Sequence, residues 1–341
     1  MVVRRRHRGT VIALPTVKEI FDLVRDDLGK VEQEIAEQSG AASEPVAEMA
    51  RYLLGGGGKR LRPALLLLSA GYAGYRGDTA IHLGAVVELI HSATLIHDDV
   101  IDGADTRRGR PSANSRWGNH RSVLAGDWLY MQSFRMALEE RNFKVLDILI
   151  DLTQNMVEGE VAQLSTLWRM DLGEPEVIEL AARKTACLFS GCAQLGAVLG
   201  RLQASEEQAL ADYGRYAGVA FQLVDDLLDF TASPAQLGKP VLSDLKEGKV
   251  TLPLIYALES AAGDGAAGRR MVRTVLEEKG FHSVSAEDIS SLVRDSDALE
   301  RTRLLAHDYA HRAKACLNGR AETEYGRALF AVPDFILDRQ A

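Results

Sequence analysis

The stretch His91–Trp117, HSATLIHDDVIDGADTRRGRPSANSRW, decides how this chain of 341 residues folds. It begins as an apolar run with helical spacing, which three aspartates, Asp98, Asp99 and Asp102, then interrupt. Steps of three and four residues stay on one stripe of an α-helix, so His91, Asp98 and Asp102 are predicted to line up turn after turn. Carboxylates this close repel each other by about 1 kcal/mol in water and by more where they are buried. We therefore expect a divalent metal ion on this stripe.

A second acidic stretch, FQLVDDLLDF at Phe221–Phe230, repeats the pattern. A single cluster of this kind is more often a solvated acidic turn than a metal site. Two clusters inside apolar runs reverse that balance, because buried carboxylates without a counter-charge are costly. Carboxylate oxygens suit hard cations, and Mg²⁺ completes its shell with oxygens of an anionic substrate. The predicted Mg²⁺ ligands are Asp98, Asp99, Asp102, Asp225, Asp226 and Asp229.

Composition excludes several classes of protein. Hydrophobic residues make up 46% of the chain and charged residues 26%, an ordinary globular balance. The net charge of −8 argues against general nucleic-acid binding. We find no secretory signal and no uninterrupted apolar run of the roughly 18–20 residues that span a membrane. Three cysteines without metal-ligand spacing fit reduced thiols, so we predict a cytoplasmic protein.

Helical periodicity dominates the chain, and alternation typical of strands is absent. The predicted helical segments are Val17–Gln38, Val46–Leu54, Ala80–Ile101, Ser122–Glu139, Phe143–Leu172, Val177–Leu199 and Glu206–Phe230. We predict an all-α fold in which residues 17–341 form one helical bundle around a central cavity. Residues 1–16, which include the basic run Arg4–Arg8, are expected to be a disordered tail, with weak contact to a membrane surface as the alternative.

A glycine run, Gly55–Gly58, precedes three cations, Lys59, Arg60 and Arg62. Glycine lets backbone approach a ligand closely. The segment is not a P-loop, because Arg60 follows the lysine where that motif requires Ser or Thr. We interpret it as a cationic grip for phosphate, and a surface turn with solvated cations is the alternative.

Two acidic faces across a cavity could hold a diphosphate through bridging metal ions, and that arrangement weakens the C–O bond of an attached alkyl group. Cations that could steady this diphosphate are Lys184, Lys239 and Lys249. A second anion pocket could form from Lys59, Arg62, His91 and Arg108. Two such pockets beside an apolar, dry cavity suggest the coupling of two apolar diphosphates.

The chain resembles the trans-isoprenyl diphosphate synthases of the polyprenyl synthetase family, in particular its medium- and long-chain, octaprenyl-type members. The resemblance covers about Val17–Leu317. It rests on DDVID at Asp98–Asp102 with Arg107 and Arg108 behind it, DDLLD at Asp225–Asp229 behind Phe221 and Gln222, GGKRLRP at Gly57–Pro63, GK at Gly238–Lys239 and DLKEGKVTLP at Asp244–Pro253. One departure is Leu242, where many members carry glycine.

The resemblance implies an all-α, cytoplasmic, homodimeric prenyltransferase that uses Mg²⁺. The substrates would be isopentenyl diphosphate and an allylic diphosphate, with at most peripheral membrane contact for product release and no nucleic-acid partner. By the same resemblance, Asp98, Asp102 and Asp225 are the principal metal ligands, and Asp99, Asp226 and Asp229 support them. The allylic diphosphate would contact Arg107, Lys184, Thr185, Gln222, Lys239 and Lys249. Isopentenyl diphosphate would be held by Lys59, Arg62, His91 and Arg108. The catalytic group would comprise Asp98, Asp102, Asp225, Lys184 and Lys239.

Product length depends on the residues below the first acidic cluster. The residues expected there are Ala93, Thr94, Ile90 and Val87. Ala93 and Thr94 are small, whereas large aromatic residues at these positions in the family resemble a floor that stops growth at short products. We therefore expect a product longer than C20 and expect Ala93→Tyr to shorten it. Other candidates for the floor of the cavity are Met131, Phe134 and Met136.

Other functions remain open on the sequence. A short-chain (C15 or C20) farnesyl or geranylgeranyl diphosphate synthase would share the motifs. A non-catalytic subunit of a heteromeric synthase typically lacks one acidic motif, whereas both are intact here. A terpene cyclase usually carries a different second motif, and a plain metal-binding helical protein leaves the paired arginines unexplained.

Overall fold

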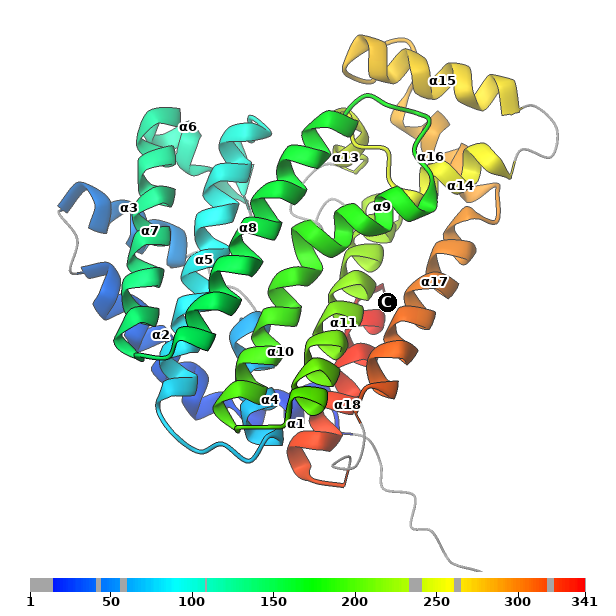
Figure 1. Cartoon of the computed structure of the whole chain (residues 1–341). Coiled ribbons are helices and arrows are strands. Elements are labelled where there is room, and N and C mark those ends of the chain that lie inside the picture. The colour runs from blue at the N-terminus through cyan, green and yellow to red at the C-terminus, as the bar shows by residue number, and fades with distance from the viewer. Residues whose placement is uncertain are drawn as a thin grey trace, which may run out of the picture.

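The computed structural model of the chain describes residues 15–40, 44–55, 60–107, 109–232, 241–260, 265–317 and 322–340. Most of these residues are helical, and the two short strands β1 and β2 are the only strands among them, which confirms the predicted all-α class (Figure 1). The basic tail lies outside the described residues except for Pro15 and Thr16. The division into a tail and a single domain stays a prediction.

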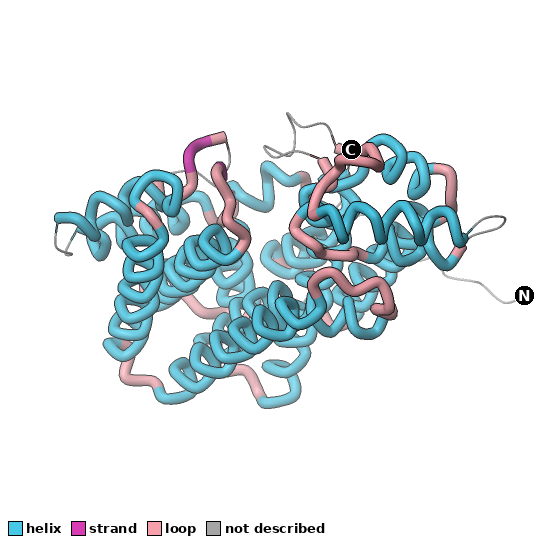
Figure 2. The backbone as a smooth tube through the Cα atoms, turned by 90° about the horizontal axis from the view of Figure 1, so that it is seen from above, coloured by secondary structure: helices cyan, strands magenta, loops and turns pink. Residues whose placement is uncertain are grey.

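The first half of the chain forms eight helices and one small hairpin. Their bounds are α1 (Val17–Asp22), α2 (Arg25–Gly40), α3 (Glu44–Leu54), α4 (Leu61–Tyr72), α5 (Thr79–Ile101), β1 (Thr106–Arg107), β2 (Arg110–Pro111), α6 (Ala113–Trp117), α7 (Asn119–Glu139) and α8 (Phe143–Thr166). The hairpin pairs β1 with β2 in antiparallel register and was not expected from the sequence. Figure 2 shows it at one edge of the bundle.

The second half is also helical. Its elements are α9 (Glu174–Ala181), η1 (Ala182–Ala186), α10 (Cys187–Leu199), α11 (Ala204–Thr231), α13 (Ser243–Lys246), α14 (Leu252–Glu259), α15 (Gly265–Glu278), α16 (Ala286–Arg294), α17 (Ala298–Ala315), α18 (Glu324–Leu337) and η2 (Asp338–Gln340). In Figure 1, α8, α10, α11 and α17 run side by side, and α13 to α16 gather at one end of them. One hydrophobic cluster contains residues from α1 through α18.

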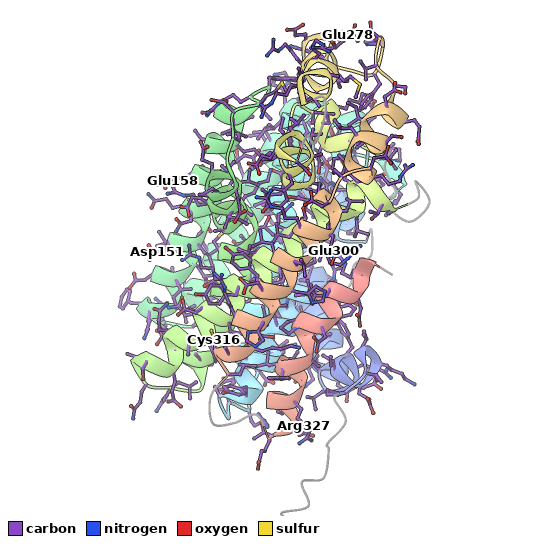
Figure 3. All side chains as sticks on the ribbon, turned by 90° about the vertical axis from the view of Figure 1, so that its right-hand side faces the viewer. Asp151, Glu158, Glu278, Glu300, Cys316 and Arg327 are labelled. Atoms are coloured by element: carbon purple, nitrogen blue, oxygen red, sulfur yellow. The ribbon has the colours of Figure 1, made fainter. Side chains whose placement is uncertain are left out.

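Local chemistry sets several helix ends. Thr16 begins α1 with a reciprocal capping box to Glu19, and Asn142 caps α8 through its side chain. α4 begins after Arg60, whose φ of +45° is left-handed, and nearly every residue of this helix is buried. Polar side chains such as Asp151, Glu158 and Glu300 point outward from the bundle (Figure 3).

Three predicted helices differ in their bounds. The segment Val17–Gln38 is broken near Leu23 into α1 and α2. The helix expected to reach Leu172 ends at Thr166, because the chain becomes extended at Leu167 and left-handed at Trp168. The segment Val177–Leu199 lies within three consecutive elements, α9, η1 and α10.

α5 is long and apolar enough to cross a membrane by length and composition, contrary to the expectation that no segment would be. Two thirds of its most apolar window (67%) is buried inside the bundle, however. A central core helix meets the same two criteria, so these properties carry no membrane assignment. The helix packs against α2, α4, α7 and α10.

Candidate functional site

The first acidic cluster lies at the C-terminal end of α5. Asp98 is half-buried beside the ion pair formed by Lys184 and Glu160, whose Nζ and Oε2 atoms are 2.5 Å apart. Burial raises the pKa of Asp98 to about 6, and Lys184 partly offsets that rise. Lys184 therefore reaches the first cluster from a distant segment, and its contact with the allylic diphosphate stays a prediction. Glu160 had not been assigned a role, and no sequence motif marks it.

Lys184 and Thr185 belong to η1, a π-helical turn between α9 and α10. Such turns are rare and often occur at functional sites. α8 approaches η1 closely at Gly159, where an added Cβ would lie 2.8 Å from the Cβ of Arg183 and 2.9 Å from the backbone nitrogen of Lys184. The absence of a side chain at Gly159 thus lets Glu160 come next to Lys184.

Asp99 lies about 100° around α5 from Asp98 and is only 1% exposed. Its Oδ1 atom accepts a hydrogen bond of 2.7 Å from Nε of Arg107, which lies on the small hairpin. Its Oδ2 atom is buried and lacks a hydrogen-bond partner. Burial raises the pKa of Asp99, although Arg107 opposes that rise. Asp99 therefore holds Arg107 beside the cluster.

The second cluster lies near the C-terminal end of α11. Asp225 forms an ion pair of 3.1 Å with Arg339, whose guanidinium also stacks over the ring of Phe221. Arg339 belongs to η2 near the end of the chain and was not identified from the sequence, where no motif surrounds it. Asp226 is buried, and burial together with Asp244 raises its pKa to about 8.

A chain of hydrogen bonds joins η1 to this cluster. Thr185 Oγ1 donates to Gln222 Oε1 at 2.8 Å, and Gln222 Nε2 donates to Asp226 Oδ1 at 2.9 Å. Both Thr185 and Gln222 had been predicted to lie at the site, and the structure brings them together.

Asp229 connects the second cluster to the first through α13. Its carboxylate accepts hydrogen bonds from the backbone nitrogens of Ser243 and Asp244, which begin this short helix. α13 ends in a turn in which the nitrogen of Lys249 donates to the carbonyl of Asp244 at 2.8 Å, with Gly248 in a left-handed conformation. Lys249 Nζ then lies 3.1 and 3.2 Å from the carboxylate oxygens of Asp102. The two acidic clusters are therefore linked across the site.

The electrostatics of Lys249 favour its charged form. Burial lowers its pKa, but Glu247 and Asp102 outweigh burial and raise it overall. The lysine is thus a fixed cation at the end of the first cluster.

Leu242, which stands where many similar sequences have glycine, has a φ of +56°. This left-handed conformation costs a leucine about 1 kcal/mol or more relative to glycine. The Leu242 side chain is fully buried, which offsets that cost.

The cations after the glycine run take different roles. Arg62 Nη1 lies 3.1 Å from Nε2 of His91, and its guanidinium packs over the ring of Phe189. Burial lowers the pKa of Arg62, while the charges of Glu88 and Asp225 oppose that effect. Arg60 instead turns into the fold and forms an ion pair of 2.6 Å with the buried Glu88. The structure thus brings Arg62 and His91 together as predicted.

Three predicted site residues, Lys59, Arg108 and Lys239, lie outside the described residues. Their roles remain predictions.

The carboxylates fit a divalent cation. Among the residues that the structure describes, no three His, Cys, Asp or Glu side chains converge as a preformed metal site. Mg²⁺ needs no such convergence when one or two carboxylates, water and substrate phosphates hold it. The unpartnered Oδ2 atom of Asp99 and the raised pKa values of Asp98 and Asp226 show acidic groups that lack sufficient counter-charge. A cation would stabilise their ionised forms.

The residues expected to control product length lie along α5. Ala93, Ile90 and Val87 are fully buried, and Thr94 is partly buried. Helical spacing puts Thr94 and Val87 on the stripe of Asp98 and turns Ala93 away from it.

On α7, Met136 is buried, Phe134 is partly buried and packs on the core, and Met131 is exposed. Met131 therefore points away from the core and is a poor candidate for the floor.

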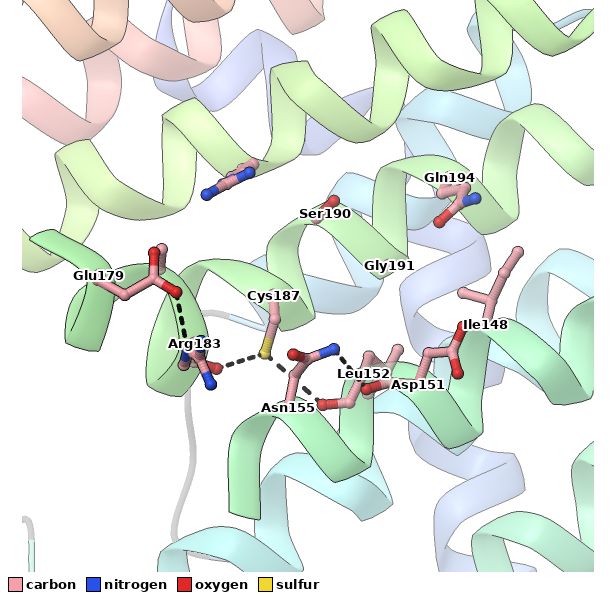
Figure 4. Close-up of a pocket in the computed structure, with 12 residues that line it drawn as sticks. Ile148, Asp151, Leu152, Asn155, Glu179, Arg183, Cys187, Ser190, Gly191 and Gln194 are labelled. Atoms are coloured by element: carbon pink, nitrogen blue, oxygen red, sulfur yellow. Dashed lines mark hydrogen bonds and ion pairs between the residues drawn. The ribbon is translucent and has the colours of Figure 1, made fainter. Parts of the chain in front are cut away.

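A separate hollow of about 310 Å³ lies between α8 and α10 (Figure 4). Arg183 faces it and pairs with Glu179 at 2.7 Å, whereas the adjacent Lys184 pairs with Glu160. η1 thus separates this hollow from the acidic clusters.

Comparisons with known proteins agree with this geometry. The family model described as "Polyprenyl synthetase" matches residues 43–288. The chain is 38% identical to the octaprenyl diphosphate synthase of Escherichia coli K12, over 95% of this chain and 99% of the relative. Among solved structures, it is similar to a polyprenyl synthase from Caulobacter crescentus complexed with calcium and isoprenyl diphosphate (TM-score 0.90, 34% identity, 97% and 100% of the two chains). It is also similar to a decaprenyl diphosphate synthase from Rhodobacter capsulatus (TM-score 0.87, 35% identity, 95% and 99%).

Proposed function

Because this chain belongs to the polyprenyl synthetase family, we propose that it joins isopentenyl diphosphate head-to-tail to an allylic diphosphate at the two acidic clusters. The protein is a prenyltransferase of the long-chain type, as its octaprenyl and decaprenyl relatives are named. The contact between Lys249 and Asp102 carries the proposal for the site, since it joins the loop behind the second cluster to the first cluster.

Members of this family use divalent metal, and Mg²⁺ is the ion we propose for this chain. Bound Mg²⁺ would draw electron density from the diphosphate and so weaken the allylic C–O bond. Asp98, Asp102 and Asp225 are the proposed ligands. Asp99, Asp226 and Asp229 support the site through the hydrogen bonds to Arg107, Gln222 and α13.

The cations of the site bind and orient the two substrates. The proposed contacts of the allylic diphosphate are Arg107, Lys184, Thr185, Gln222, Lys239 and Lys249. Those of isopentenyl diphosphate are Lys59, Arg62, His91 and Arg108. When the C–O bond breaks, its electron pair leaves with the diphosphate, which Lys184 and Lys249 would stabilise.

The double bond of isopentenyl diphosphate then attacks the allylic carbon, and the resulting cation loses a proton to give the trans product. The released diphosphate is the proposed base, so no protein side chain is assigned that role. Apolar residues around the site would exclude water that could quench the cation.

The first test is incubation of the purified protein with Mg²⁺, labelled isopentenyl diphosphate and farnesyl diphosphate, followed by chromatography of the dephosphorylated products. The proposal expects an EDTA-sensitive ladder that ends beyond C20. An end point at C15 or C20 would keep the chemistry and contradict the chain-length assignment. Lack of incorporation with any allylic primer would contradict the catalytic proposal and favour a subunit that needs a partner chain.

We also propose that the protein is a homodimer, and two exposed apolar stripes support this. On α7 the stripe contains Leu124 (66% exposed), Met131 and Leu138. On α8 it contains Phe143 (80% exposed), Ile150, Val157 and Leu164. A spacing of seven residues keeps side chains near one face of a helix, and contiguous exposed apolar surface marks an interaction site. α7 and α8 are consecutive helices that contact each other (Figure 1), and we propose that their two stripes together form one apolar face.

Sedimentation velocity tests this proposal with a matched pair of variants. Met131→Asp should convert the dimer into a monomer, because it buries a charge at the centre of the face. Leu304→Asp is the control, since Leu304 is 61% exposed on α17, away from both stripes. A wild-type protein that sediments as a monomer, or a Met131→Asp variant that stays dimeric, would contradict the proposal.

A further inference from the structure

Trp168 adopts a backbone conformation that a tryptophan rarely takes. Its φ of +66° lies in the left-handed region, which favours glycine and asparagine. It lies in the loop that follows α8, and its side chain is still 36% exposed. Burial of the ring therefore does not fully explain why the chain keeps tryptophan in this conformation.

The neighbours of Trp168 belong to the loop that carries Lys249. The backbone nitrogen of Trp168 donates to the carbonyl of Gly248 at 2.8 Å. The indole ring packs against the same residue so closely that a Cβ on Gly248 would lie 2.6 Å from the ring atom Cε2. Lys279, which directly follows α15, places its Nζ atom 5.4 Å from the centroid of the indole ring. Trp168 thus holds Gly248 through both its backbone and its ring.

Gly248 precedes Lys249, whose ammonium group contacts the carboxylate of Asp102. The turn that ends α13 fixes the backbone of Lys249 from one side, through the hydrogen bond to Asp244. Trp168 supports the same turn from the α8 side. A movement of Gly248 would therefore move the Lys249 backbone relative to the first acidic cluster.

We propose that Trp168 is a positioning residue that holds Lys249 at the diphosphate of the allylic substrate by clamping Gly248. This inference rests on the proposed function of Lys249. Trp168 does not touch the substrate in this arrangement, so its effect passes through Lys249. A binding group misplaced by about 1 Å can cost up to about a hundredfold in rate, so the clamp has a measurable consequence.

A double-mutant cycle tests this route. Trp168→Ala should raise KM for farnesyl diphosphate about tenfold in the native background. In a Lys249→Met background the same change should alter KM by less than about twofold, because interacting residues are not additive. Trp168→Phe should retain most of the native KM, since a smaller ring still packs on Gly248. Equal effects of Trp168→Ala in both backgrounds would overturn the proposal.

Fluorescence gives a readout that does not require turnover or the Trp168→Ala variant to fold. In a protein with Trp117→Phe and Trp128→Phe, Trp168 is the remaining tryptophan of the sequence. Inorganic pyrophosphate with Mg²⁺ should shift its emission, and Lys249→Met should remove the shift. An unchanged emission while calorimetry shows pyrophosphate binding would overturn the clamp. Failure of the native protein to bind pyrophosphate and to incorporate isopentenyl diphosphate would instead contradict the proposed function.

Discussion

The ammonium nitrogen of Lys249 lies 3.1 Å from a carboxylate oxygen of Asp102, although 147 residues separate them in the chain. Asp229 of the second acidic cluster accepts hydrogen bonds from the first backbone nitrogens of α13, the short helix that leads to this lysine. One cluster therefore positions the cation that contacts the other. We therefore expect a substitution in the loop that carries Lys249 to affect both acidic clusters.

Lys249→Met should lower kcat/KM for the allylic diphosphate by about 10- to 100-fold, because a hydrogen bond to a charged group contributes about 1.5–3 kcal/mol. Steady-state kinetics with a range of farnesyl diphosphate concentrations measures the effect. Lys246→Met is the matched control, since Lys246 is exposed at the end of α13, three residues before Lys249. Equal losses in the two variants would mean that Lys249 has no specific role.

The stability of the metal-free protein should depend on pH through two buried aspartates. Burial raises the pKa of Asp98 to about 6 and that of Asp226 to about 8. Both values exceed the pKa of an unfolded aspartate, so the native state binds more protons. The free energy of unfolding should therefore fall as the pH rises from about 4 to about 8.

Mg²⁺ requires the ionised carboxylates, so the thermal stabilisation that it gives should grow over the same pH range. Thermal unfolding with EDTA and with Mg²⁺ at about pH 5.5 and about pH 8.5 measures both effects. In the Asp98→Asn variant, the fall in the free energy of unfolding at the acidic end of this pH range should be smaller than in the native protein. A thermal shift by Mg²⁺ that is independent of pH would contradict this prediction.

Larger side chains below the first cluster should shorten the product. Thr94 lies one turn before Asp98 on the same stripe of α5, so Thr94→Phe should block the path of the growing chain. Ala93→Tyr should also shorten the product, although Ala93 points away from that stripe. Chromatography of the dephosphorylated products measures the end point, with Leu304→Phe on the outer surface as the control. An unchanged ladder in both variants would place the floor on another helix.

Phe134 on α7 is the next candidate for that floor. His97 contacts the carbonyl of Val123 and His82 contacts that of Met136, so α5 and α7 run antiparallel and Phe134 lies at about the level of Ala85. Phe134→Ala should lengthen the product, because removal of the ring deepens the cavity. About one isoprene unit is expected for each helical turn of about 5.4 Å by which the cavity deepens. Met131→Ala, a change on the exposed face, should leave the product ladder unchanged.

Gly159→Ala should weaken both the fold and the activity. The new Cβ would lie 2.9 Å from the Lys184 backbone nitrogen, which cannot rotate away. Overpacking of this kind costs about 1–3 kcal/mol and would displace η1. Gly29→Ala is the control, because no atom lies within 4 Å of its added Cβ and a helical alanine gains about 0.5–1 kcal/mol. Thermal unfolding and isopentenyl incorporation measure the two consequences.

The features that could be predicted from the sequence are those that depend on helical periodicity and on sequence motifs. α5 was predicted almost to the residue, because its apolar spacing is unbroken until Asp98. The sequence and the family resemblance assigned Arg62 with His91 to one diphosphate and Thr185 with Gln222 to the other, and the structure places the members of each pair in contact.

Features that depend on tertiary contacts were not predictable. No local pattern marks the π-helical turn at Lys184, because its cause is the packing of α8 and α11 around it. Glu160 and Arg339 acquire their partners only in the fold. The left-handed conformation of Trp168 depends on Gly248, 80 residues further along the chain (248 − 168).

The ion pairs at the site imply that substrate capture is an exchange of partners. Lys184, Lys249, Arg107 and Arg339 each already contact a carboxylate, so an arriving diphosphate meets cations that are already paired. Each cation must leave an acidic neighbour as it takes up a phosphate oxygen, and the released carboxylate becomes available to a metal ion. Diphosphate and metal should bind cooperatively, since each frees the partner that the other requires.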